Sequence, residues 1–359
     1  MAYTTIDDPS AYFQTALYTG GNGSNNTPID VTNSGNSDLQ PDWVWIKRRD
    51  GAASHGLFDS SRGVNKILNS DSTDAEVTGE TDLLDEFKTD GFGLGANTGS
   101  ENVNKGGTSY VAWQWKANGG TTASNTDGSI TSTVQANTDA GFSIVTYTGN
   151  GSGGATIGHG LGATPKWFFV KSRSVSSRSW IHYHNGTGST PQNDYLNFTT
   201  SAKGTTSAAW NNTAPTTSVA SLGSSAEVNE NGTTFVGYFF AEKQGYSKFG
   251  SYEGNNNADG TFVYLGFKPS FMLIKNIDGT NNWMMLDNKR DTDNPILNAL
   301  VANGNNAEFA DSGDLCDFLS NGVKMRVAGQ GTNNAATFIY MAFAESPFVS
   351  SEGVPTTAR

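Results

Sequence analysis

One sequence pattern recurs three times along this chain of 359 residues. In each copy a proline opens an apolar run that a lysine closes six residues later. These residues are Pro41 and Lys47, Pro165 and Lys171, and Pro269 and Lys275. Each copy ends on an aromatic-rich stretch, whose last residues are Trp115, Phe240 and Phe343. From the proline to this last aromatic residue the separations are 74, 75 and 74 residues. So constant a spacing predicts a repeated domain, not a single enzyme with one active site.

Composition and local patterns favour strands. Glycine accounts for 43 of the residues, and only 16% are charged while 11% are aromatic, which is typical of many short strands joined by turns. The proline-to-lysine runs are apolar at nearly every position, as expected of central strands covered on both faces. Residues 129–135, 142–147 and 261–265 also read as strands. Residues 83–87 and 315–319 are each expected to form one helical turn, ahead of the hairpin signals Asp90-Gly91 and Asn321-Gly322.

We therefore expect an all-β protein of three tandem antiparallel β-sandwich modules, jelly-roll or lectin-like, each with roughly seven to nine strands. The expected domains are 1–119, the first module with an N-terminal arm; 120–141, a linker and leading strand; 142–245, the second module; 246–345, the third; and 346–359, a C-terminal arm. We call 1–119, 142–245 and 246–345 the first, second and third segments. Trp115, Phe240 and Phe343 are expected in the cores of their modules.

Charge and cysteine content limit the partners and the compartment. The formal net charge is −12 and the pI about 4.7, without a basic stripe, so nucleic acid is not an expected partner. The densest basic cluster, Lys47-Arg48-Arg49, is interpreted as a solvated strand end. The single cysteine, Cys316, is expected to be a buried structural thiol in a chain folded in a reducing compartment. The N-terminus lacks signal-peptide features, and no apolar run is long enough to predict membrane insertion.

Two histidines could form half of a metal site. His182 and His184 stand two residues apart and would lie on one face of a strand. No third ligand can be identified from spacing, and the matching positions of the other copies carry no histidine. The alternative, which we favour, is a surface strand facing solvent.

Acidic residues offer two further candidates. Asp59 and Arg62 recur as Asp287 and Arg290, while the second copy has Tyr183 and Gly186; we interpret the pair as an aspartate that caps a turn and an arginine that crosses to it. The run Asp291-Thr292-Asp293-Asn294 could hold Ca²⁺, but it lacks the glycine and distal glutamate of an EF-hand and is expected to be a solvated loop. We therefore expect no catalytic residue, no cofactor and no metal.

Several stretches resemble a module of structural proteins from marine tailed bacteriophages. They include Gly141–Gly151, Pro165–Lys171 and Leu39–Lys47, together with the closing stretches at residues 110–115 and 340–348. The resemblance spans nearly the whole chain and implies a virion setting, either on the tail or on the head. Its motifs are structural, so they imply no particular chemistry.

The expected function is that of a non-enzymatic virion protein, made in the host cytoplasm, which serves as a tail-fibre or receptor-binding component. The alternatives are a capsid-decorating or head-fibre protein, and a lectin-like or carbohydrate-active protein. Expected partners are other virion proteins, a host-surface glycan or protein, and further copies of the chain. A homo-oligomer is expected, with a trimer the best guess, because polar terminal arms could pair with a neighbouring subunit.

Overall fold

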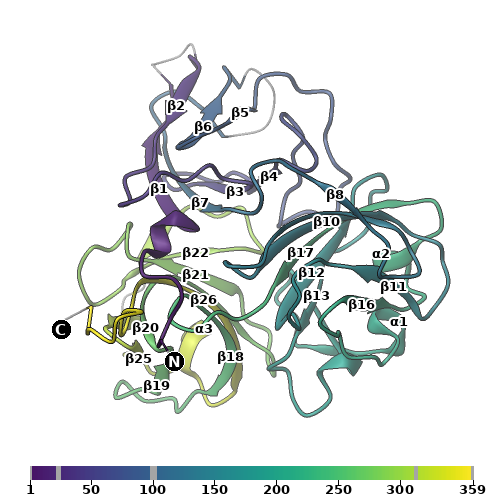
Figure 1. Cartoon of the computed structure of the whole chain (residues 1–359). Coiled ribbons are helices and arrows are strands. Elements are labelled where there is room, and N and C mark those ends of the chain that lie inside the picture. The colour runs from purple at the N-terminus through teal and green to yellow at the C-terminus, as the bar shows by residue number, and fades with distance from the viewer. Residues whose placement is uncertain (1, 22–25, 98–102, 311–313, 357–359) are drawn as a thin grey trace.

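The computed structural model describes residues 2–21, 26–97, 103–310 and 314–356. Strands account for 42% of the residues and helices for 5%, so the expectation of an all-β protein is confirmed. The chain forms three lobes that meet at a common centre (Figure 1). Within the described ranges, no helix is long and apolar enough to cross a membrane.

The first segment folds as a larger and a smaller antiparallel sheet. The larger has the order β1 (Phe13–Thr19), β7 (Ser109–Trp115), β3 (Trp43–Arg48) and β4 (Gly56–Asp59). The smaller has the order β2 (Ile29–Val31), β6 (Gly91–Leu94) and β5 (Leu84–Lys88). A short 3₁₀ helix, Pro9–Ala11, precedes β1.

The second segment has an eight-stranded larger sheet. Its order is β15 (Gly204–Thr205), β14 (Asp194–Asn197), β13 (Ile181–His184), β12 (Trp167–Ser172), β17 (Thr234–Phe240), β10 (Phe142–Thr148), β9 (Ser132–Asn137) and β8 (Ala123–Asn125). Strands β11 (Ala155–Gly158) and β16 (Val219–Leu222) form the smaller sheet, with single-turn helices α1 (Ser207–Trp210) and α2 (Ala226–Asn229) and a 3₁₀ turn, Pro191–Asn193, beside them. The stretch 120–141 thus contributes β8 and β9 to this sheet.

The third segment repeats this two-sheet arrangement. Its larger sheet has the order β18 (Ser247–Glu253), β26 (Thr337–Pro347), β20 (Phe267–Asn276), β21 (Trp283–Asp287), β22 (Asn298–Val301) and β23 (Phe309–Ala310). Its smaller sheet has the order β19 (Phe262–Tyr264), β25 (Gly322–Met325) and β24 (Cys316–Leu319), and α3 is Gln330–Asn333.

The central strands pair in the same register in all three segments. The first and last strands of each copy pair over seven residues, from Phe13 opposite Trp115, from Phe142 opposite Phe240, and from Ser247 opposite Phe343. The lysine-bearing strands β3, β12 and β20 then pair with β7, β17 and β26, and each lysine is the penultimate residue of its strand. Pro41 and Pro165 precede their strands, whereas Pro269 lies inside β20 at a register shift.

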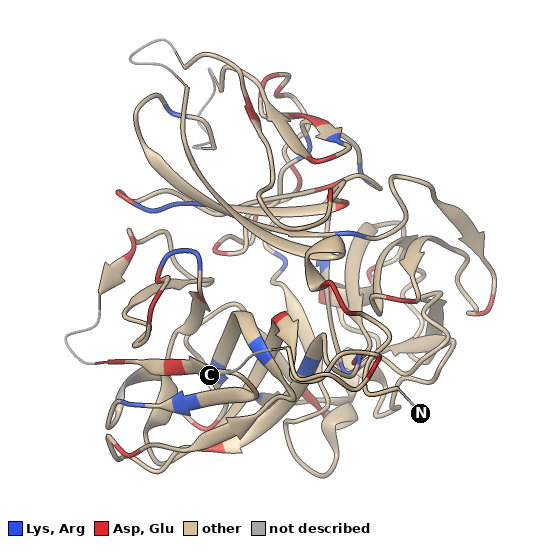
Figure 2. Cartoon of the chain, turned by 60° about the vertical axis from the view of Figure 1, so that its left-hand side comes forward, with Lys and Arg blue, Asp and Glu red and all other residues tan. Residues whose placement is uncertain are grey.

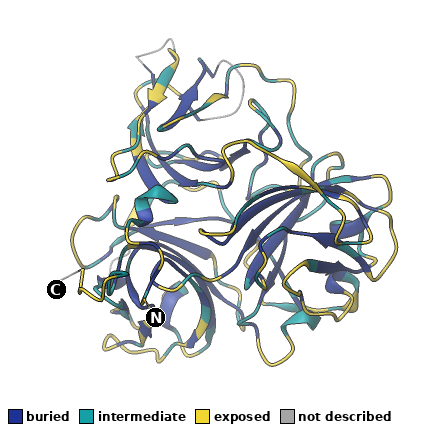
Figure 3. Ribbon diagram, viewed as in Figure 1, coloured by how far each residue is buried: buried dark blue, intermediate teal, exposed yellow. Residues whose placement is uncertain are grey.

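Each lysine-bearing strand is buried on both faces, as its sequence predicts. In β3, Val44 and Ile46 face the core between the two sheets of the first segment, and Trp43 and Trp45 face the opposite way. Strands β12 and β20 alternate in the same manner. Because both faces of these sheets are covered, exposure is concentrated in loops and edge strands (Figure 3).

The outward faces of the three larger sheets meet in one shared aromatic core. Trp43 of the first segment stacks on Tyr238 of the second, with ring centroids 4.5 Å apart. Trp167 of the second approaches Trp283 of the third at 5.8 Å. Trp115, Phe240 and Phe343 are each 1% exposed, which confirms their burial, but they lie in this shared core and not between the two sheets of one module.

Two short stretches differ from expectation. Residues 83–87 and 315–319 contain strands β5 and β24, not helical turns. Each pairs with the strand that follows, Lys88 opposite Gly91 and Leu319 opposite Gly322, so the hairpin that the glycines indicate extends backward over both stretches. Apolar residues that suit one helical turn equally suit a strand lying over a sheet core. Cys316 is fully buried in β24, as expected.

The described parts of both terminal arms bind their own chain. Tyr3 donates its hydroxyl to Gly266 O at 2.7 Å, and Thr4 Oγ1 donates to Gln244 O at 2.8 Å. Ser351 N donates to Asp7 Oδ1 at 2.6 Å, which joins the two arms. These contacts hold the described part of each arm against its own chain.

Candidate functional site

Hydrogen bonds between segments run around the shared core in a closed ring. Trp180 Nε1 of the second segment donates to Asn69 O of the first at 2.9 Å. Trp283 Nε1 of the third donates to Asn197 O of the second at 2.9 Å. His55 Nε2 of the first donates to Val301 O of the third at 2.9 Å. His55 lies just before β4, Trp180 lies just before β13, and Trp283 is the first residue of β21. Equivalent positions therefore each bind a neighbouring segment.

The three lysines that close the apolar runs are buried, which corrects the expected solvated strand end at Lys47. Lys47 Nζ donates to Arg48 O at 2.8 Å and across to Asn305 O of the third segment at 3.3 Å. Lys275 Nζ donates to Asn281 O at 2.7 Å and across to Thr200 O of the second at 3.1 Å. Lys171 Nζ donates to Arg178 O. Burial lowers the pKa of each lysine to about 8.

The pair of Asp59 and Arg62 lies at the boundary between the first and second segments. Both side chains are fully buried and ion-paired, and Asp59 Oδ1 also accepts from Arg62 N at 2.8 Å, as the turn-capping interpretation requires. Tyr238 of the second segment donates its hydroxyl to Asp59 Oδ2 at 2.7 Å. Glu76 bridges Arg62, at 2.9 Å, and Arg173 of the second segment, at 2.9 Å. Burial alone would lower the pKa of Arg62, but the charges of Asp59, Tyr238 and Glu76 raise it, so the guanidinium stays charged.

The boundary between the third and first segments has the same design. Arg290 pairs with Asp287 at 2.6 Å, and Trp113 of the first segment donates to Asp287 Oδ2 at 3.1 Å. Glu308 bridges Arg290, at 3.1 Å, and Arg49 of the first segment, at 2.8 Å. The recurrent acidic and basic residues thus join segments to one another.

Strand register corrects the expected equivalence in the second segment. Asp59 lies opposite Trp43 and Asp287 opposite Phe271, but the residue opposite Trp167 is His184 and not Tyr183. Counting from the lysine misplaces this position by one residue, because the connection after β12 is longer. His184 Nε2 donates to Tyr340 O of the third segment at 3.1 Å, so a neutral imidazole takes the place of the ion pair at this boundary.

All four histidines are buried as neutral imidazoles. Each Nδ1 accepts an N–H: from Trp45 in His55, from Leu161 in His159, from Trp167 in His182 and from Gly186 in His184. Burial lowers the pKa of His55 to about 3 and those of His159 and His184 to about 4, and it lowers the pKa of His182 well below its usual value. The expectation that His182 and His184 face solvent is therefore wrong. Among the described residues, no three His, Cys, Asp or Glu side chains converge as metal ligands.

Replacing Asp59 with alanine is expected to lower the free energy of unfolding by about 3 kcal/mol or more. The Arg62 guanidinium would remain charged and buried without the carboxylate that now pairs with it. Urea denaturation followed by tryptophan fluorescence measures the change. Glu86→Ala is the matched control, since it removes one partner of an ion pair with side chains 29% and 61% exposed and should change stability by less than about 0.5 kcal/mol. Equal effects of the two substitutions would contradict the structural role of Asp59.

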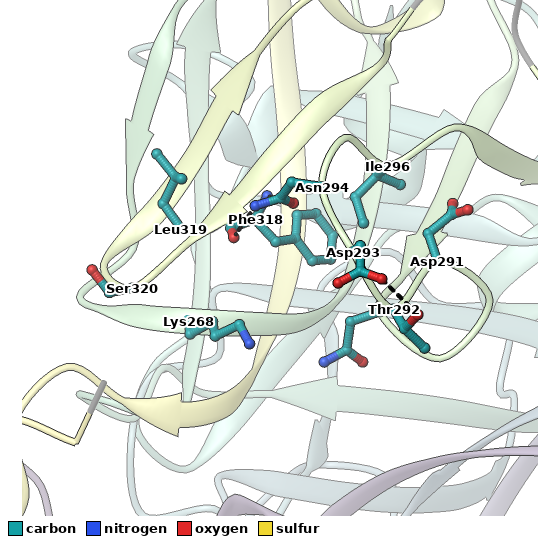
Figure 4. Close-up of a pocket in the computed structure, with 10 residues that line it drawn as sticks. Lys268, Asp291, Thr292, Asp293, Asn294, Ile296, Phe318, Leu319 and Ser320 are labelled. Carbon is teal, nitrogen blue, oxygen red and sulfur yellow. Dashed lines mark hydrogen bonds between the residues drawn. The ribbon is translucent and has the colours of Figure 1, made fainter. Parts of the chain in front are cut away.

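A cavity of about 330 Å³ opens on the third segment. One wall is the loop after β21, with Asp291, Thr292, Asp293 and Asn294, and the other is the end of β24 and the turn after it, with Leu319 and Ser320 (Figure 4). Ile296 and Phe318 form an apolar floor, and Lys268 and Asn288 complete the lining. Because it combines an apolar floor with polar walls, we take this cavity as a candidate binding site outside the segment boundaries.

Internal hydrogen bonds fix the loop that forms this cavity. Asn294 Oδ1 accepts from Phe318 N at 2.8 Å, and Asn294 Nδ2 donates to Phe318 O at 2.9 Å, as a strand neighbour would. Asp291 Oδ2 accepts from Leu297 N and Asn298 N, at 3.0 and 2.8 Å, and its Oδ1 accepts from Asn298 Nδ2 at 2.5 Å. Both carboxylate oxygens of Asp291 are therefore engaged, which leaves this loop poorly suited to hold Ca²⁺.

The remaining polar groups of the cavity point to solvent or have few partners. Asp293 is exposed, and Thr292 Oγ1 lies 3.4 Å from its carboxylate. Lys268 Nζ pairs with Glu345 at 2.5 Å, with side chains 36% and 42% exposed. Asn288 Oδ1 accepts from Ser270 Oγ at 3.2 Å, and within the described residues its Nδ2 makes no hydrogen bond. Elsewhere, basic residues are scattered among acidic ones (Figure 2).

A family model described as a domain of unknown function, DUF7483, matches residues 8–347. The match covers nearly the whole chain, so the chain belongs to this family. No curated protein and no solved structure matches it.

Proposed function

We propose that this DUF7483 protein is a non-enzymatic structural protein of a bacteriophage virion, which serves as a tail-fibre or receptor-binding component. We also propose that its three segments are copies of one β-sandwich module. The observation that carries the proposal is the use of the recurrent polar side chains: Lys47 and Lys275, the two Asp–Arg pairs and the bridging glutamates join segments to one another. Polar groups buried between segments give a rigid framework that carries its loops on the outside, which suits display to a host surface.

The buried histidines and cysteine support the non-enzymatic part of the proposal. The four histidines, which would be the first candidates for proton transfer near neutral pH, are neutral and have their Nδ1 atoms occupied. The Cys316 thiol is buried, and burial raises its pKa, which makes it a poor nucleophile. Purified protein is therefore expected to hydrolyse no polysaccharide, peptide or phosphate ester.

A homo-oligomer, with a trimer as the form expected for a fibre, remains part of the proposal and rests on the virion setting alone. A capsid-decorating or head-fibre role is the second location that the family resemblance allows. Copy number separates the two, because a fibre contributes a few copies to each particle and a decorating protein contributes many.

Quantitative mass spectrometry of purified particles tests the location. We expect the protein in particles of the phage that encodes it, and antibody labelling should place it on the tail. Labelling spread over the head would favour the decorating role instead. Particles that lack the protein, or turnover that disappears on replacing one carboxylate, would contradict the proposal.

A further inference from the structure

We propose that the cavity between the 291–294 loop and the 319–320 turn binds a neutral hexopyranose, and that this is how the receptor-binding role proposed above recognises a host glycan. The cavity volume of about 330 Å³ lies at the small end of ligand sites, which suits one or two sugar rings. Its walls come from the loop after β21 and from the end of β24 with the turn that follows (Figure 4).

The lining has the two kinds of surface that a pyranose needs. The C–H face of a sugar ring is apolar and can lie against Ile296, Phe318 and the side chain of Leu319. Sugar hydroxyls both donate and accept, and they would meet the Asp293 carboxylate, the Asn288 Nδ2 and the Ser320 hydroxyl. The two carboxylate oxygens of Asp293 can accept from neighbouring hydroxyls as a bidentate pair.

Charge favours a neutral sugar over an acidic one. The lining has two carboxylates, on Asp291 and Asp293, against the single amine of Lys268, whose charge is already paired with Glu345. A uronic or sialic acid would place a third negative charge beside these two carboxylates, at a cost that like charges impose at close range. A cation-dependent site is disfavoured as well, because both carboxylate oxygens of Asp291 already accept hydrogen bonds from Leu297 and Asn298.

The loop that builds the cavity is preformed and differs from its counterpart. In the first segment, Asn65 Oδ1 accepts from Leu83 N at 2.8 Å, as Asn294 does from Phe318 N. The stretch between the arginine and the next isoleucine is one residue longer in the third segment and carries two aspartates where 63–66 carries none. The same asparagine hydrogen bond thus holds both loops, while the loop of the third segment is longer and more acidic. A loop that differs on a similar framework is where a binding site is expected.

Saturation-transfer NMR of the full-length protein tests the proposal with methyl glycosides of glucose, galactose, mannose and N-acetylglucosamine, and with glucuronic and N-acetylneuraminic acids. We expect saturable binding of at least one neutral glycoside, with a dissociation constant on the order of a millimolar. Asp293→Ala should weaken it roughly tenfold, since a hydrogen bond to a charged group is lost. Ser320→Trp should abolish it by filling the cavity. Asp139→Ala removes an exposed acid from the turn between β9 and β10 and should leave binding unchanged.

Three results would overturn the site: no saturable binding of any neutral glycoside, equal binding by wild type and both cavity variants, or preference for the acidic sugars. Loss of binding on adding EDTA would also overturn it in favour of a cation site. Circular dichroism melts should show that all variants fold. If the protein is present in virions and binds host cells but binds no neutral glycoside, this inference is wrong and the proposed function stands. Sugar binding by a protein absent from virions would sink the proposed function alone.

Discussion

Trp43→Ala is expected to lower the free energy of unfolding by about 3–5 kcal/mol and to weaken all three segments together. Trp43 is fully buried, and its ring stacks on Trp115 of the same segment at 4.2 Å and on Tyr238 of the second at 4.5 Å. The cavity left behind would lie in the shared core, where no single segment can close over it.

Native-state hydrogen exchange distinguishes a shared loss from a local one. Amides of β10 and β26 should lose protection by about the same free energy as those of β7, because the three sheets depend on one core. Leu17→Ala, on β1 but 42% exposed, is the control and should change protection by less than about 0.5 kcal/mol. Loss confined to β7 and its neighbours would show instead that the segments are independently stable.

Acidification is expected to unfold the protein through its buried histidines, with stability falling between about pH 6.5 and pH 4. The pKa of His184 drops from 6.5 to about 4 on folding, so below pH 6.5 the unfolded chain takes up a proton that the native state refuses. Its stabilising contribution is complete above pH 6.5 and is lost as pH falls through the folded pKa; for His184 alone it amounts to roughly 3 kcal/mol. The geometry gives the same sign, because protonating Nδ1 would set its new N–H against the Gly186 N–H.

Urea denaturation at pH 7 and at pH 4.5 measures this effect. His184→Gln should reduce the difference between the free energies of unfolding at the two pH values, even if it also lowers stability at pH 7. The reason is that the unfolded chain of the variant binds one proton fewer at pH 4.5. His159→Gln is the matched control, since the His159 imidazole hydrogen-bonds to Thr216 O and Leu161 N within its own segment. It should reduce the difference by a similar amount without loosening the contact to Tyr340. A stability that is flat from pH 7 to pH 4.5 in wild type would contradict the histidine account.

Local pattern determined the strands well. The runs that begin at Pro41 and Pro165 became central strands, since short stretches that are apolar at nearly every position suit a sheet covered on both faces. Spacing also placed the three lysines at equivalent strand ends. The sequence could not tell a helical turn from a strand at 83–87 and 315–319, because five residues span too little of either period.

Only the tertiary structure decided what the polar residues do. Lys47, Asp59 and His184 look like surface residues in a linear reading, since charged and imidazole side chains are costly to bury without partners. Those partners lie in other segments: Asn305 for Lys47, Tyr238 for Asp59 and Tyr340 for His184. The sequence alone predicted strands at a constant spacing; that the three segments close into a ring around one aromatic core depends on contacts between residues far apart in the chain, which local periodicity does not encode.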